Sequence, residues 1–350
     1  MASDLQLVGQ GSSSALRHDR KAILVLGMHR SGTSALTRVI NLLGASVSHN
    51  MMLPNGANPS GYWESKKLYS FHQELLAELG TCWDDWNAFE VIESSEWTMQ
   101  RAARVHELLH AELGDTMCFV VKDPRICRFV PLWLKALQMF AAEPLAVIPI
   151  RNPLEVAASL KVRNAFPIAK SCLLWLRHVI DAERATRRIR RSFIRYDDLL
   201  SRWPIEMQRV AGDLGIEWPN DPKAVSDAIH GFLTSRLRHH VSTIDELDAR
   251  AEVADWVRRT YASIDALMAG RQEQSYRELD EIGMEFDYAC RAFVGVFDED
   301  LKSALRECKL KNAALTAEVQ ALKRRTPSGR WRTVRRKVHS MIRVGILRKV

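Results

Sequence analysis

The stretch Lys21-Ala-Ile-Leu-Val-Leu-Gly27-Met-His-Arg-Ser-Gly32-Thr-Ser34 decides the fold of this chain. Its first half is a continuous apolar run that ends in glycine, which predicts a buried strand. From about Thr33 to Leu43, apolar residues recur on one face of a helix. The turn between strand and helix has glycines at the spacing of a phosphate-binding loop, and the backbone N–H groups of such a turn attract an anion.

The loop differs at one position from the loops that bind ATP or GTP, and this difference narrows the range of phosphate donors that it suits. The position after the second glycine, where ATP- and GTP-cleaving proteins carry lysine, holds Thr33, and a cation stands instead inside the loop at Arg30. This pattern favours a donor with a single phosphate that carries the transferable group. The backbone at Gly32 and the hydroxyls of the loop would hold that group, and Arg30 would stabilise charge on the bridging oxygen; the hydroxyls belong to Ser31, Thr33 and Ser34.

Further apolar runs predict a sheet. They cover residues 117–121 and 145–150, and residues 192–196 are expected to form a fourth strand. Helical patterns near 64–80, 97–113, 129–142, 153–159 and 167–190 lie between the strands. Asn152 and Pro153 suit the N-cap and first position of a helix. Strands that alternate with helices predict an α/β fold with a mostly parallel central sheet. Because ligands bind beyond the carboxyl ends of such strands, the segments ending in Arg30, Arg125, Arg151 and Tyr196 should converge there.

The order of these motifs resembles that of the sulfotransferases that use 3′-phosphoadenosine 5′-phosphosulfate (PAPS). Met28-His-Arg-Ser-Gly-Thr-Ser34 resembles their 5′-phosphosulfate loop, and Arg151-Asn-Pro-Leu-Glu-Val-Ala-Ala-Ser159 resembles their 3′-phosphate element. Ile194-Arg-Tyr-Asp-Asp-Leu199 matches their Tyr-acidic-acidic-Leu strand end. Elements of a bacterial branch are matched by Asn58-Pro-Ser-Gly-Tyr-Trp-Glu64, Lys122-Asp-Pro-Arg125 and Leu237-Arg-His239.

The resemblance implies a P-loop-like sulfotransferase fold over about residues 20–240. It also implies in-line sulfuryl transfer from PAPS, as co-substrate and without a metal, to a hydroxyl of a glycan or glycolipid. Arg30 would be catalytic. The residues that would bind PAPS are Arg30, Ser31, Gly32, Thr33, Ser34, Arg151, Ser159 and Arg238.

The transfer also needs a general base. Glu64 is the leading candidate because the family places a carboxylate or histidine on the segment after the first helix, and His72 and His49 are its rivals. Lys122, Asp123 and Arg125 fit either an ion-pair cluster or a substrate contact. Trp83 and Trp86 fit either a sugar-stacking surface or the packing of a loop.

Charge and hydropathy divide the 350-residue chain into regions. We expect a disordered leader at residues 1–20, the sulfotransferase-like domain at residues 21–245 and a helical extension at residues 246–325. The formal net charge of +8 belongs to the end of the chain, since the residues from Lys323 onward include eleven lysines and arginines and no acid. The segment 326–350 therefore predicts a basic amphipathic tail, which suits either an anionic membrane surface or an acidic partner, or is simply solvated.

Other partners follow from the same segments. Residues 301–322 carry three apolar heptads with one core Asn, which favours a homodimer; a helix packed on its own domain would show the same pattern. The sequence has no apolar run long enough for a membrane span, so we expect a cytoplasmic protein with peripheral contact to the inner face of the membrane. No nucleic-acid partner is expected.

Two other functions stay open at this stage. One is a P-loop kinase whose lysine is displaced from the loop. The other is a non-catalytic sulfotransferase-like scaffold that docks at membranes.

Overall fold

The computed structural model describes residues 20–293 except 57, 90, 92–94 and 234–239, together with residues 307 and 311. The chain divides into two compact units, Met1–Asp287 and Tyr288–Val350, and the sheet lies in the first. The first unit therefore extends past the expected boundary at residue 245. Arg238, the basic tail, all but Arg20 of the leader and all but two residues of the heptad segment lie outside the described residues.

The predicted α/β fold is confirmed. Among the described residues, four parallel strands form one sheet in the order β2-β1-β3-β4. They are β1 (Arg20–Val25), β2 (Cys118–Lys122), β3 (Ala142–Ile150) and β4 (Arg190–Arg195). Each corresponds to a strand predicted from the sequence, with ends that differ by no more than three residues.

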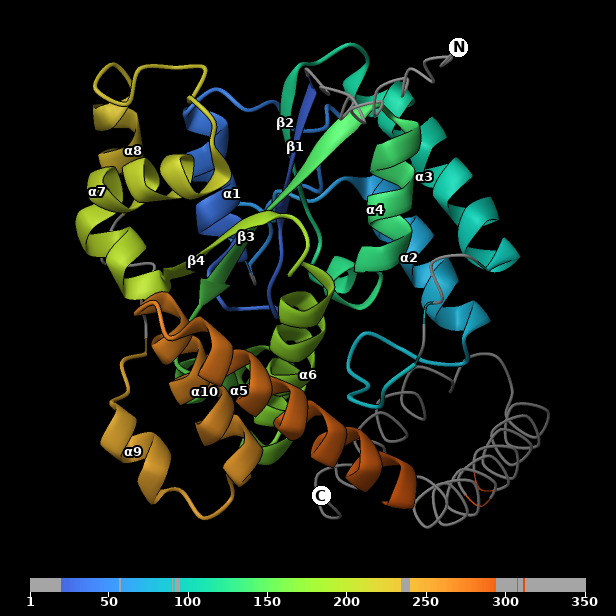
Figure 1. Cartoon of the computed structure of the whole chain (residues 1–350), viewed down its shortest axis with the longest axis vertical. Coiled ribbons are helices and arrows are strands. Elements are labelled where there is room, and N and C mark those ends of the chain that lie inside the picture. The colour runs from blue at the N-terminus through green and yellow to red at the C-terminus, as the bar shows by residue number, and fades with distance from the viewer. Residues whose placement is uncertain are drawn as a thin grey trace, which may run out of the picture. The chain divides into compact units, whose positions relative to one another are not determined.

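Helices lie between and after the strands (Figure 1). They are α1 (Thr33–Leu42), α2 (Lys66–Glu78), α3 (Glu96–Leu113), a 3-10 turn (Pro124–Arg128), α4 (Val130–Met139), α5 (Pro153–Asn164), α6 (Ile168–Ala185), α7 (Tyr196–Leu214), α8 (Ser226–Phe232), α9 (Ile244–Ala249) and α10 (Asp255–Met268). A further helix begins at residue 272. None of the helices in the described part of the chain is long and apolar enough to span a membrane.

The sheet is covered on both faces. Helices α1 and α7 pack on one face, with α8 against α1, while α4 packs on the other face with α3 and α6 against it (Figure 1). Ile23 and Val25 belong to the core under α1 and α7, and the alternate residues Ala22 and Leu24 are buried as well. A strand buried on both faces needs an apolar side chain at every position, which explains why β1 is a continuous apolar run.

Two helix starts position the residues around the site. Asn152 caps α5 through its side chain, which accepts a hydrogen bond from the Leu154 N–H at 2.9 Å, and Pro153 is the first helical residue, as predicted. Tyr196 differs from the prediction, since it is the first residue of α7 and not the last of a strand. The backbone leaves the sheet at Arg195, so the Tyr196 ring lies beside the carboxyl end of the sheet.

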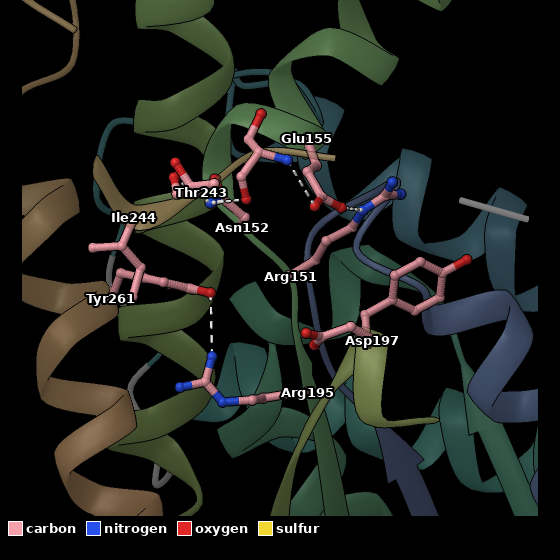
Figure 2. Close-up of a pocket in the computed structure, with 10 residues that line it drawn as sticks. Arg151, Asn152, Glu155, Arg195, Asp197, Thr243, Ile244 and Tyr261 are labelled. Carbon is pink, nitrogen blue, oxygen red and sulfur yellow. Dashed lines mark hydrogen bonds and ion pairs between the residues drawn. The ribbon is translucent and has the colours of Figure 1, made fainter. Parts of the chain in front are cut away.

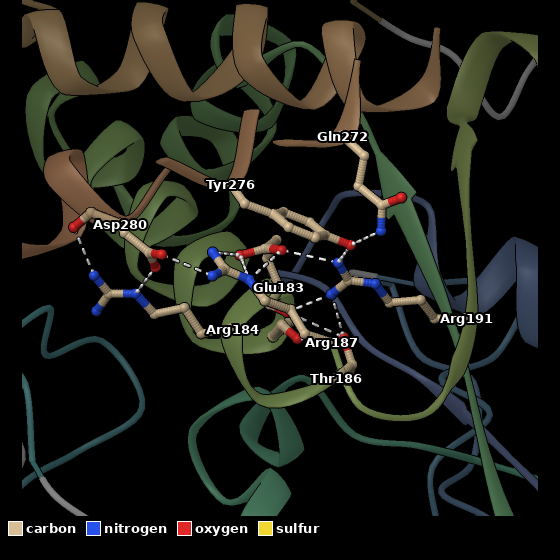
Figure 3. A network of polar contacts seen from close by, with 9 residues as sticks. Glu183, Arg184, Thr186, Arg187, Arg191, Gln272, Tyr276 and Asp280 are labelled. Atoms are coloured by element: carbon tan, nitrogen blue, oxygen red, sulfur yellow. Dashed lines mark hydrogen bonds and ion pairs between the residues drawn. The ribbon is translucent and has the colours of Figure 1, made fainter. Parts of the chain in front are cut away.

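A buried carboxylate fixes the helix that begins at residue 272 to the core (Figure 3). Glu183 on α6 is fully buried, with Arg187 Nη2 2.7 Å and Arg191 Nη2 2.9 Å from its oxygens. The same arginines reach across to that helix, where Arg191 contacts Tyr276 and Arg187 contacts Asp280. A buried charge requires such partners, so this network joins residues beyond 270 to the domain that contains the sheet.

Candidate functional site

The turn between β1 and α1, the candidate anion-binding loop, is built around two left-handed residues. Arg30 has φ +71° and Gly32 has φ +89°. Gly32 has a second constraint, because a Cβ at this position would overlap the ring of Tyr196. The loop therefore depends on glycine at this point both for its backbone conformation and for the contact with α7.

Polar groups of the loop are open toward a ligand. The N-cap residue of α1 is Gly32, which has no side chain to cap the helix, and the first turn of α1 carries no acidic residue. The Ser31 hydroxyl is buried and has no hydrogen-bond partner among the described residues. An uncapped helix N-terminus beside an unpartnered buried hydroxyl fits an anion such as a phosphate. Thr33, also buried, begins the helix.

Arg30, Arg151 and Ser159 converge beside this loop, although they are up to 129 residues apart in sequence. Arg30 Nε donates to Ser159 Oγ at 2.7 Å, and Arg151 Nη1 donates to the carbonyl oxygen of Arg30 at 3.0 Å. Arg151 is also paired with Glu155 at 2.8 Å and lies over the Tyr196 ring at 4.7 Å. Burial lowers the pKa of Arg30, and the charge of Arg151 lowers it further. Two cations held this close in a partly buried place are suited to an anionic ligand.

A buried ion pair closes the opposite side of the loop. Lys122, the last residue of β2, has its ammonium 2.5 Å from Glu64 Oε1, 2.8 Å from the Tyr62 carbonyl oxygen and 3.1 Å from Ser34 Oγ. Because an ammonium has three donors, all of them are used. The Ser34 hydroxyl in turn donates to the Tyr62 carbonyl at 3.1 Å. The Ser34 hydroxyl therefore anchors the segment that carries Glu64. A ligand would contact Ser34 through its backbone N–H instead.

Glu64 is 3% exposed. Burial raises the pKa of its carboxyl group, against the opposing effect of Lys122. Its other oxygen lies 4.0 Å from Arg125 Nη1. A carboxylate whose pKa is moved toward neutrality is suited to accept a proton from a hydroxyl.

His72 belongs to a separate buried network. The Trp133 indole donates to His72 Nε2 at 3.0 Å, so the ring hydrogen is on Nδ1, which lies 2.9 Å from Asp123 Oδ2. Burial alone would raise the pKa of Asp123, but Arg125 and His72 hold it well below its usual range. Both ring nitrogens of the fully buried His72 are therefore used in holding Asp123 in place, which leaves neither for a substrate proton. The cluster of Lys122, Asp123 and Arg125 is thus an ion-pair cluster.

Two of the remaining predicted residues, His49 and Trp83, make packing or backbone contacts. His49 is exposed, and its Nδ1 lies 3.0 Å from the carbonyl oxygen of Glu112. Trp83 packs a loop: its ring stacks with Phe166 at 5.7 Å and meets His29 edge-on at 4.7 Å. In the described part of the chain, no group of three His, Cys, Asp or Glu residues is placed to hold a metal ion.

Two residues near the loop were missed in the sequence. His29 is inside the loop, with a buried Nε2 that has no partner among the described residues, and burial followed by the charges of Arg125 and Arg163 lowers its pKa well below the usual value. Arg163 lies one helical turn beyond Ser159 on α5. That spacing of four residues, which places both on one helix face, was the available signal.

A cavity of about 190 Å³ adjoins Arg151 and Tyr196 (Figure 2). Its other walls come from Asn152, Glu155, Arg195, Asp197, Ser242, Thr243, Ile244 and Tyr261. The loop before α9 is tied to this wall, because Asn152 Nδ2 donates to the carbonyl oxygens of Ser242 and Thr243 at 3.1 and 3.2 Å. The cavity is thus a built compartment next to the convergent arginines.

Fold and site together describe an α/β protein with a glycine-containing loop after its first strand, and with one arginine inside that loop and another at a neighbouring strand end. No protein-family model matches the chain, and no curated protein matches it.

Two solved structures are similar in fold. One is the sulfotransferase domain from the curacin biosynthetic pathway, with 15% identity and TM-score 0.41 over 70% of this chain and 98% of that domain. The other is the sulfotransferase domain of the Synechococcus PCC 7002 olefin synthase, with 15% identity and TM-score 0.36 over 75% and 94%.

Proposed function

We propose that this protein is a sulfotransferase that moves a sulfuryl group from PAPS to a hydroxyl of a glycan or glycolipid. The observation that carries the proposal is the convergence of Arg30, Arg151 and Ser159 at the uncapped start of α1. The cluster offers two anion positions side by side. PAPS has a phosphate at each end of its ribose, so it matches two such positions.

Each part of the donor has residues suited to it. The 5′-phosphosulfate would lie on the loop, against the Ser31 hydroxyl and the backbone from Gly32 to Ser34, with Thr33 at the helix start. The 3′-phosphate would lie at Arg151 and Ser159, together with Arg238. The cavity beside Tyr196 would take the base, since cavities of about 150 Å³ accept a benzene ring.

In the proposed reaction, the acceptor oxygen attacks sulfur in line with the bridging oxygen of the 5′-phosphate. The new S–O bond forms as the bond to the bridging oxygen breaks, and the electron pair stays on the phosphate of the departing 3′-phosphoadenosine 5′-phosphate (PAP). Arg30 stabilises the charge that develops on that oxygen. Glu64 accepts the proton of the acceptor hydroxyl, and Lys122 holds the carboxylate in its ionised form.

The kinase alternative is less well supported. Lys122 reaches Ser34 from the neighbouring strand, as a displaced P-loop lysine would. However, its three donors are all used by protein oxygens, so the ammonium has no donor left for a β- or γ-phosphate. The scaffold alternative gives no reason for keeping Arg30 and Arg151 close together, where their like charges repel.

The outer regions add proposals that do not affect the reaction. Residues 301–322 would form a homodimer, and the basic segment 326–350 would bring a cytoplasmic enzyme to the inner face of the membrane, where a glycolipid acceptor resides.

Separate titrations of PAP and ATP test the proposed function. The full chain should bind PAP with micromolar or tighter affinity, and ATP at least about tenfold more weakly because ATP has no 3′-phosphate for Arg151. The variant R151Q should remove this preference. Tight binding of ATP without any response to PAP would overturn the proposal.

A further inference from the structure

Arg163 on α5 has donors that the protein does not use. Its Nε donates to Asn164 Oδ1 at 2.5 Å, and its guanidinium lies over the Trp83 ring at 5.2 Å. Among the described residues, neither Nη group has a hydrogen-bond acceptor and no carboxylate forms an ion pair with it. A half-buried guanidinium of this kind has a fixed plane and open Nη groups, which is the arrangement that binds an oxyanion in bidentate fashion.

Other arginines around the site, unlike Arg163, form ion pairs with carboxylates. Each of the following pairs with a carboxylate at 2.5–2.8 Å: Arg125 with Asp123, Arg128 with Asp181, Arg151 with Glu155 and Arg177 with Asp287. Each of these four arginines thus has an acid of its own. Arg163 is an exception.

Contacts place Arg163 beside the loop. The Trp83 ring beneath it meets His29 of the loop edge-on at 4.7 Å, and Ser159, one helical turn before Arg163 on α5, accepts a hydrogen bond from Arg30. Burial and the charge of Arg30 lower the pKa of Arg163 to about 10, while Tyr62 and Glu64 raise it. Arg163 therefore lies next to Arg30, and Glu64 is also among the charges that act on it. In an in-line transfer, the acceptor enters from the side opposite the leaving phosphate.

The position of the Arg163 side chain is prepared in advance. Trp83 is held by Phe166 and His29, and its loop is fixed by Asp84, which pairs with Lys170 at 2.6 Å, and by Asp85, whose carbonyl oxygen accepts from Arg128 at 2.9 Å. A guanidinium stacked on a fixed indole loses little freedom when a ligand binds. Trp83 is thus a positioning residue for Arg163.

We propose that Arg163 binds an anionic group of the acceptor, a carboxylate or a phosphate ester on a sugar, and so presents a neighbouring hydroxyl to Glu64. This inference rests on the proposed function and names the acceptor class as acidic. A neutral sugar would leave the Nη groups without a partner, and that difference provides the selectivity.

Calorimetric titration of the PAP-loaded full chain tests this with three probes: methyl glucuronide, methyl glucoside 6-phosphate and methyl glucoside. At least one of the two anionic glycosides should bind about tenfold or more tightly than the neutral one. R163Q should abolish that difference while its affinity for PAP and its thermal midpoint stay unchanged. The matched control is R101Q, which removes an arginine that also stacks on a tryptophan, Trp97 at 5.0 Å, but is paired with Glu78; it should keep the preference.

Three results would overturn the inference. They are equal binding of all three glycosides, a preference that survives in R163Q, and a loss of PAP affinity in R163Q, which would assign the arginine to the donor. PAP binding without any charge preference contradicts this inference alone, whereas absence of PAP binding contradicts the proposed function as well.

Discussion

Replacing Lys122 by methionine should destabilise the fold strongly, because it leaves the Glu64 carboxylate buried without its cation. Lys122 and Glu64 are 4% and 3% exposed, and their charged atoms are 2.5 Å apart. Removing one partner of a buried ion pair costs about 3–5 kcal/mol in the free energy of unfolding. The substitution also removes donors to Tyr62 and Ser34, so the segment that carries Glu64 should loosen from the loop.

The loss in the free energy of unfolding caused by K122M should depend on pH, and it should be smaller at low pH. Burial raises the folded-state pKa of Glu64 above its ordinary value, and loss of Lys122 removes the main influence that lowers it. The folded variant then binds a proton that the unfolded chain releases, so its stability is greatest at low pH and falls as pH rises toward the raised pKa. At pH 5 the cost of K122M should shrink to about 1–3 kcal/mol, the cost of unsatisfied polar groups alone.

Urea unfolding of the full chain at pH 5 and pH 8 measures both effects. The matched control is K21M, whose ion pair with Glu143 lies at the other end of the sheet and is about a quarter exposed, so it should cost less than about 1 kcal/mol at either pH. The double variant K122M/E64Q should recover much of the loss at pH 8. If K122M unfolded within about 1 kcal/mol of the natural chain at pH 8, or if its cost were equal at both pH values, the account of this ion pair would be wrong.

Three further substitutions probe the site. R30A should lower the transfer rate by about 100- to 1000-fold with an unchanged circular dichroism spectrum, since it removes charge stabilisation at the bridging oxygen; turnover like that of the natural chain would refute this role. E64Q should lower kcat by about 100- to 10,000-fold and leave PAP affinity intact, while E78Q, at an exposed ion pair, should change neither; a full kcat in E64Q would exclude Glu64 as the base. G32A should weaken PAP binding and lower the thermal midpoint, because alanine is strained at φ +89° and overlaps Tyr196. G80A carries the same backbone strain in open space and isolates that part of the cost, so equal effects of the two variants would argue against the Tyr196 contact.

The elements whose signals lie in residues adjacent in sequence were predictable. Apolar runs identify β1, β2 and β3 because most of their residues are buried, and Asn152-Pro153 identifies the start of α5 because cap chemistry is local. The convergence of Arg30 and Arg151 followed from a general property of parallel sheets. The sequence prediction assigned Tyr196 to the strand because an apolar residue at this position fits both the end of a strand and the first turn of a helix.

The partners of individual side chains could not be predicted. Nothing near Lys122 in the sequence indicates that Ser34, Tyr62 and Glu64 together use all of its donors. The choice between Glu64 and His72 depended on Trp133, which lies 61 residues from His72 in sequence. Arg163 could be distinguished from the other arginines only when the acids that pair with those arginines were known. These are properties of tertiary packing, which no local pattern encodes.

Incubation of the full chain with PAPS radiolabelled in the sulfuryl group, together with fractionated glycan and glycolipid extracts, tests the central claim most directly. The claim predicts that label appears on a glycan or glycolipid in step with the release of PAP, and that R30A abolishes both. Release of PAP with all of the label recovered as inorganic sulfate, or label transfer that R30A leaves intact, would contradict it.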